Sequence, residues 1–160
     1  MDDGLAVLTV VTALGCGLSG GALFAFSSFV MAALRRLPAA QGIAAMQSIN
    51  IMAPTPVFMT ALFGTGLLCI VLIVWALAAW DGSYGPWLLA GSALYLAGPV
   101  GVTMGYNVPR NNALARLDPA DPGAEAYWRR YVTEWTRGNH VRVALGLAAA
   151  AACTEALIVG

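Results

Sequence analysis

The chain has 160 residues, which is the length of one domain, and 59% of them are hydrophobic, with a mean hydropathy of +0.74. Only 10% of the residues are charged, against roughly 25% in soluble domains, which excludes a disordered chain and disfavours a soluble globular domain. Basic and acidic residues balance at eight each, so the chain has no basic field to bind nucleic acid. The partner that this composition favours is the lipid bilayer.

Four stretches are long and apolar enough to cross a bilayer core, which takes about 20 helical residues. In chain order they cover residues 5–34, 57–80, 86–104 and 141–160. Backbone polar groups inside lipid must be satisfied within the chain, so each stretch is expected to be a helix. The sequence therefore predicts an all-α fold, an integral membrane four-helix bundle, with residues 1–160 forming a single four-span transmembrane domain.

Arginines account for all of the basic residues, and they gather on one side of the predicted bundle. They occupy the first loop, the third loop and the edge of the fourth span: Arg35, Arg36, Arg110, Arg116, Arg129, Arg130, Arg137 and Arg142. The first and third loops of a four-span protein share a side, and basic loops stay in the cytoplasm. We therefore expect a multi-pass protein of the cell (inner) membrane, with these loops cytoplasmic and both termini outside.

The third loop is the only long polar segment, and an additional helix is predicted over its residues 123–137. Tyr127, Tyr131 and Trp135 recur there at every fourth position, which places them on one face. Such an amphipathic helix would lie on the cytoplasmic membrane surface or cap the bundle. In the first loop, a shorter helical stretch is expected within residues 38–56.

Two pairs of glycines are spaced for close packing between helices. Gly17 and Gly21 form one small-xxx-small step in the first span, and Gly101 and Gly105 form another in the third. Such steps can bring helices together within one chain or between two chains. A homo-oligomer is therefore one possible assembly, and the sequence leaves the oligomeric state open.

His140 is the single histidine, and it is expected at the start of the fourth span, between Asn139 and Arg142. An imidazole takes up protons near neutral pH, so His140 is a candidate general base. The alternative is a polar collar that anchors the helix at the membrane interface. One histidine without a nearby carboxylate cannot supply the three ligands of a catalytic metal, so no metal site is predicted. Haem needs only one axial ligand and could in principle use His140.

Several amide side chains fall on the same side of the membrane as the histidine. Gln47 and Asn50 are three residues apart, Asn107 and Asn111 follow the third span, and Asn139 precedes the fourth. Amides near lipid are costly unless they are hydrogen-bonded. They either cap and join helices or converge with the histidine on one polar site.

Four segments carry a recurring pattern, in chain order and with the predicted spans between them. They are GGALFAFSSFVMAAL at residues 20–34, AMQSIN at 45–50, NVPRNNAL at 107–114 and WTRGNHVR at 135–142. Together they resemble the DUF1772 family of integral membrane proteins, which includes anthrone oxygenases. One departure is Gly138, which stands where the family often has an aromatic residue before Asn-His.

The resemblance implies a four-helix membrane enzyme that oxidises an anthrone to an anthraquinone with O2 and without a bound cofactor. On this hypothesis His140 removes a proton from a flat, apolar aromatic substrate. Amide and guanidinium donors would stabilise the resulting enolate oxygen, and other side chains would hold the rings. The expected donors are Asn50, Asn107, Asn111 and Arg142, and the expected substrate-binding residues are Gln47, Trp135, Phe24 and Asn139.

Two other functions remain open at this point. A small transporter or accessory subunit would depend on Glu155, the one acid inside a span, and on Pro99, which breaks the third span. A haem- or metal-dependent redox enzyme would use His140 from each subunit of an oligomer. A transporter should tolerate loss of His140 and be crippled by Glu155→Gln, and an oxygenase should show the reverse.

Overall fold

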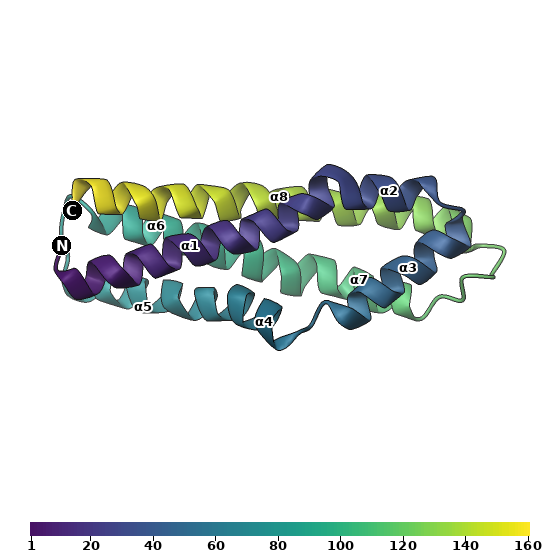
Figure 1. Cartoon of the computed structure of the whole chain (residues 1–160), viewed down its shortest axis with the longest axis horizontal. Helices are drawn as coiled ribbons and strands as arrows, with labels where there is room; N and C mark the ends of the chain where they lie inside the picture. Colours follow the sequence, from purple (N-terminus) through teal and green to yellow (C-terminus); the bar gives the residue numbers. More distant parts are fainter.

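Four long helices run side by side along the molecule, and a shorter fifth helix packs at one end (Figure 1). The structure is a computed structural model that describes all residues, 1–160, and it contains no strand. The long helices cover Asp3–Arg36, Pro56–Ala78, Gly85–Ala115 and Ala124–Val159, and each is long and apolar enough to cross a membrane. The predicted all-α four-helix bundle is thus confirmed.

The first three long helices each contain a wider π-helical segment. The first is α1 (Asp3–Ala25), η1 (Phe26–Val30) and α2 (Met31–Arg36); the second is α4 (Pro56–Met59), η2 (Thr60–Gly64) and α5 (Thr65–Ala78); the third is α6 (Gly85–Tyr95), η3 (Leu96–Asn107) and α7 (Val108–Ala115). In η3 the cause is Pro99, which has no N–H to donate to the preceding turn. Segments of this kind often mark functional sites.

The fourth long helix, α8, runs without interruption over Ala124–Val159. The prediction of a separate amphipathic helix over residues 123–137 is therefore wrong, because this stretch is the first part of α8. Its aromatic stripe faces the bundle: Tyr131 and Trp135 are buried in the cluster that also holds Met46 of α3 (Ala39–Met52). The additional helix at this end is α3, within the stretch expected in the first loop (Figure 1).

Gly138 lies inside α8, where a break was expected, and its role is in helix packing. A Cβ atom at this position would lie 2.5 Å from the Tyr106 ring and 2.8 Å from Asn107 Oδ1. Glycine therefore allows η3 to approach α8 closely, and no turn forms there. His140 consequently lies within a continuous helix and not at a helix N-terminus.

Three buried clusters follow one another along the bundle. The first, around Trp128 and Trp135, joins α2, α3, α7 and α8; the second surrounds Tyr95 in the middle; the third lies near the two termini. Large apolar side chains cover the outside of the helices, among them Val7, Leu14, Leu18, Leu67, Val74 and Leu77. Four apolar helices with apolar outer faces identify a membrane protein.

The two glycine steps singled out in the sequence do not join helices within the chain. Added Cβ atoms at Gly17, Gly21 and Gly105 would meet nothing within 4 Å. The close approaches occur at other glycines, and at Gly98 a Cβ would collide with Leu145 of α8, whose Cδ1 atom would lie 2.9 Å away. The small-xxx-small spacing could not reveal this, because it does not say which helix face meets a neighbour.

Gly98→Leu is expected to lower the melting temperature of the bundle, since its side chain must push α8 away from η3. Overpacking of this kind typically costs about 1–3 kcal/mol. Gly105→Leu is the matched control, because it adds the same side chain to the same helix at a position with nothing within 4 Å. Thermal unfolding of the detergent-solubilised protein measures both, and equal melting temperatures would contradict the packing described here.

Candidate functional site

His140 is exposed on α8 and faces η1 of the first helix. Its Nδ1 atom lies 2.9 Å from Ser27 Oγ, and this is its one side-chain hydrogen bond, so Nε2 is free. The Ser27 hydroxyl also accepts a hydrogen bond from Asn139 Nδ2 at 2.7 Å. The π-helical turn of η1 thus presents Ser27 to two consecutive side chains of α8.

The orientation of the Asn139 amide follows from its other partners. Its Nδ2 atom donates to the Leu23 carbonyl at 2.8 Å, and its Oδ1 atom accepts from Arg142 Nη2 at 2.7 Å. A carbonyl can only accept and a guanidinium can only donate, so the amide cannot be flipped. Asn139 therefore donates a hydrogen bond to Ser27 Oγ, and the Ser27 hydroxyl keeps one further acceptor position for His140 Nδ1.

This arrangement suits both protonation states of the imidazole. A neutral ring with its hydrogen on Nδ1 donates from Nδ1 to Ser27 Oγ and leaves Nε2 as the basic nitrogen, and a protonated ring can keep the same hydrogen bond, because a hydroxyl oxygen has two acceptor positions. Ser27 can thus hold the ring in one orientation while a proton is gained or lost. A general base requires a fixed ring of this kind.

Arg142 is a buried cation without a carboxylate partner. Its exposed fraction is 5%. Besides Asn139, its guanidinium donates to Thr103 Oγ1 at 3.1 Å and lies 5.0 Å from the centre of the Trp135 ring. Its Nε atom has no hydrogen-bond partner. A buried, unpaired charge is expensive, so Arg142 is a functional candidate or a support for one.

Asn107 and Asn111 meet Trp135 on the inner side of α8. Asn107 Nδ2 donates to the Trp135 carbonyl at 3.1 Å, and Asn107 Oδ1 is buried without a partner. Asn111 Oδ1 accepts from Trp135 Nε1 at 2.7 Å and from Tyr131 Oη at 2.9 Å. We call these four residues the Trp135 cluster.

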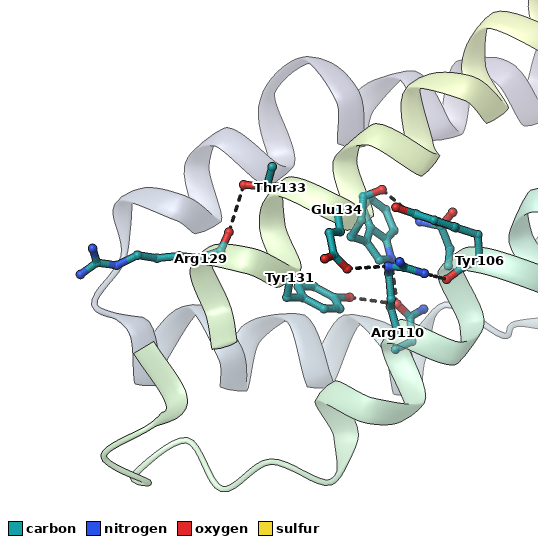
Figure 2. A network of polar contacts seen from close by, with 9 residues as sticks. Tyr106, Arg110, Arg129, Tyr131, Thr133 and Glu134 are labelled. Atoms are coloured by element: carbon teal, nitrogen blue, oxygen red, sulfur yellow. Dashed lines mark hydrogen bonds and ion pairs between the residues drawn. The ribbon is translucent and has the colours of Figure 1, made fainter. Parts of the chain in front are cut away.

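An ion pair closes the Trp135 cluster on its outer side. Arg110 Nε lies 3.0 Å from Glu134 Oε2, and Arg110 Nη1 donates to the Tyr106 carbonyl at 3.0 Å. The guanidinium also stacks 3.4 Å from the centre of the Tyr106 ring. Figure 2 shows Arg110 between these two partners, with Tyr131 beside it. These contacts hold α7 against α8.

The remaining expected residues are placed by α1 and α3. Asn50 lies against Tyr131, with its Nδ2 atom buried and without a hydrogen-bond partner. Gln47 Nε2 donates to the carbonyls of Leu114 and Leu117, each at 2.9 Å, so it caps the end of α7. Phe24 is 54% exposed on the outside of α1. None of these three side chains is hydrogen-bonded to His140.

A pocket of about 590 Å³ lies beside His140, between the first helix and α8. We call it the His140 pocket. Its lining consists of Ser27, Met31, Ala32, Arg35, Arg36, Val132, Thr133, Thr136, Arg137 and His140. Of the residues proposed from the sequence, His140 is the one that lines it.

The residues that were expected to form one site thus lie on opposite faces of α8. His140 and Arg142 are two positions apart, which in a helix of 3.6 residues per turn places them on opposite faces. Asn139 lies between and links the two sides through Ser27 and Arg142. Sequence reasoning missed Ser27 and Thr136. Both stand in segments of the family pattern, Ser27 in the first and Thr136 in the fourth, and this was the available signal.

No group of three or more His, Cys, Asp or Glu side chains is arranged to hold a metal ion. The three cysteines, Cys16, Cys69 and Cys153, are free and buried in the middle of the bundle.

Searches among curated proteins and solved structures give no significant match. The family model described as anthrone oxygenase matches residues 55–152, which is more than half of the chain. The matched range includes the Trp135 cluster, Asn139, His140 and Arg142, and it begins after Ser27 and α3. The chain therefore belongs to the anthrone oxygenase family, the DUF1772 family that its sequence resembles.

Proposed function

We propose that this protein is a membrane-bound oxygenase that converts an anthrone-like aromatic compound to a quinone with O2. The observation that carries the proposal is the geometry of His140: Nδ1 is held by Ser27, and Nε2 is free beside a pocket of about 590 Å³. Family membership supports the reaction class. His140 is the proposed general base.

The proposed chemistry needs a base more than it needs a cofactor. An anthrone has an acidic CH2 group, and removal of one proton by His140 leaves an extended enolate. The enolate transfers one electron to O2, and the resulting pair recombines to a peroxide on the same carbon. The peroxide then loses water, and one anthrone and one O2 give one quinone and one H2O. We therefore propose O2 as co-substrate, with no bound haem or metal.

The structure suggests different donors for the enolate oxygen from those first expected. Asn107 and Asn111 are hydrogen-bonded to Trp135, and Arg142 lies across α8 from His140, where it donates to the Asn139 amide that contacts Ser27. Inside the His140 pocket, Thr136 Oγ1 is buried without a partner, and Arg137 lines the same wall. We propose these two as donors to the oxyanion.

The test is O2-dependent oxidation of emodin anthrone by the purified, detergent-solubilised protein, with the spontaneous rate subtracted. We expect quinone absorbance to rise above the spontaneous rate, with one O2 consumed per quinone and no hydrogen peroxide released. A rate equal to the spontaneous one would contradict the assignment of an anthrone as substrate.

Ser27→Ala is expected to lower kcat about tenfold with little change in KM, because Ser27 positions the imidazole and does not bind the rings. Ser27→Thr keeps the hydroxyl and should recover most of the loss. Ser28→Ala is the matched control, since Ser28 donates to the Phe24 carbonyl of its own helix. If Ser27→Ala and Ser28→Ala had the same kcat, Ser27 would have no positioning role.

We also propose that the arginine-rich end faces the cytoplasm. The two termini lie together at the opposite end of the bundle from α3 (Figure 1). Basic residues near membrane helices favour the cytoplasmic side. An epitope at the C-terminus should therefore be reached by antibody on intact spheroplasts, and labelling only after lysis would reverse the orientation.

A further inference from the structure

We propose that the His140 pocket selects a substrate that carries a negative charge, such as an aromatic carboxylate. The inference rests on the proposed function for the aromatic body of the ligand and adds the chemical group by which the ligand is recognised. Three arginines from two helices carry it.

The arginines line the pocket from both sides. Arg35 and Arg36 come from the end of α2, and Arg137 comes from α8. None of them is in an ion pair, because the two ion pairs of the chain use Arg110 and Arg129. The pocket lining contains no aspartate or glutamate. The pocket is thus a concentration of positive charge with no anion in its own lining to balance it.

The other lining residues fit an aromatic acid. Guanidinium groups bind carboxylates through paired hydrogen bonds. Thr136 Oγ1 has no protein partner and is available to a ligand, whereas Thr133 is engaged with the Arg129 carbonyl at 3.0 Å. Met31, Ala32 and Val132 provide apolar surface for the rings.

A phospholipid headgroup would offer the same anionic chemistry, since arginines at membrane interfaces attract anionic lipids. The position of the pocket favours the substrate instead. Its wall includes His140 and Ser27, so whatever fills it contacts the proposed base. A lipid phosphate there would block the base and would have no acidic C–H group to present to it.

The test compares two ligands of the same size on the whole protein in phosphatidylcholine nanodiscs, with binding to empty nanodiscs subtracted. The ligands are anthraquinone-2-carboxylate and the neutral 2-(hydroxymethyl)anthraquinone. We expect the wild type to bind the carboxylate about tenfold more tightly. Arg137→Gln and Arg35→Gln should each remove most of this preference. Arg116→Gln, which changes an arginine outside the pocket, should keep it.

Equal binding of the two ligands by the wild type, or a preference that Arg116→Gln weakens as much as Arg137→Gln, would overturn the proposal. Binding and turnover are separate readouts. A preference for the carboxylate without anthrone oxidation supports the carboxylate-binding pocket and counts against the oxygenase. Anthrone oxidation without such a preference supports the oxygenase and counts against the carboxylate-binding pocket.

Nanodiscs that contain phosphatidylglycerol distinguish the two sources of the anion. If the wild type still prefers the carboxylate ligand more strongly than Arg137→Gln does in these nanodiscs, the site belongs to the aromatic acid. If phosphatidylglycerol abolishes this difference, the lipid headgroup occupies the pocket and the proposal is wrong. The general repulsion between anionic lipid and ligand affects both proteins equally, so it does not imitate either result.

Discussion

His140→Ala is expected to abolish O2-dependent oxidation of an anthrone while the bundle stays folded. General-base catalysis contributes about 10²–10⁴-fold, and the chain has no second histidine to replace the base. The side chain is exposed and makes one hydrogen bond, to Ser27, so its removal leaves no cavity in the core. Quinone formation gives the rate, and thermal unfolding with helical circular dichroism checks the fold.

Thr154→Ala is the matched control for this variant. Thr154 is exposed on the same helix, and its hydroxyl donates to the Ala150 carbonyl of its own backbone. We expect it to keep both the rate and the melting temperature. Full activity in His140→Ala would remove His140 from the mechanism, and the pocket would then have no base.

Asn139→Leu is expected to have the largest effect on stability of the changes considered. The side chain is completely buried, and it joins α8 to the Leu23 carbonyl, to Ser27 and to Arg142. Leucine would leave the guanidinium of Arg142 without its amide partner. Loss of the partner of a buried charge costs about 3–5 kcal/mol. A large fall in melting temperature, measured in detergent, is the expected result.

The control is Asn112→Leu, which changes an exposed amide of α7 that has no side-chain hydrogen bond. A second comparison isolates the role of the charge. In the double variant Asn139→Leu/Arg142→Met no cation is left to bury, so part of the lost stability should return. If Asn139→Leu melted at the wild-type temperature, the Leu23–Asn139–Arg142 contacts would not stabilise the bundle.

The number and type of the long helices could be predicted because lipid allows few alternatives. An apolar stretch of 20 residues in a bilayer has to be a helix, whatever its neighbours are. The course of α8 could not be predicted in the same way. A glycine can end a helix or let a neighbouring helix approach, and at Gly138 only the contact with Tyr106, 32 residues earlier in the chain, decides between the two.

The candidate site was predictable in composition and not in arrangement. His140, Asn139 and Arg142 are close in the sequence, which suggested one cluster, but a helix turns by about 100° per residue and separates their faces. The partner that fixes the histidine, Ser27, is 113 residues away along the chain. Its role depends on the π-helical turn of η1, which no local pattern of residues indicated.

The length of α8 determines where the chemistry meets water. The helix has 36 residues and so extends about 54 Å, whereas the hydrocarbon layer is about 30 Å thick. The part from His140 to Val159 rises about 29 Å. With its apolar end at one edge of the hydrocarbon, the helix therefore carries His140 to the opposite edge. The apolar rings of the proposed substrate, and O2, can reach this edge from the lipid side, while the proposed carboxylate and the proton stay in contact with the aqueous phase at the same edge.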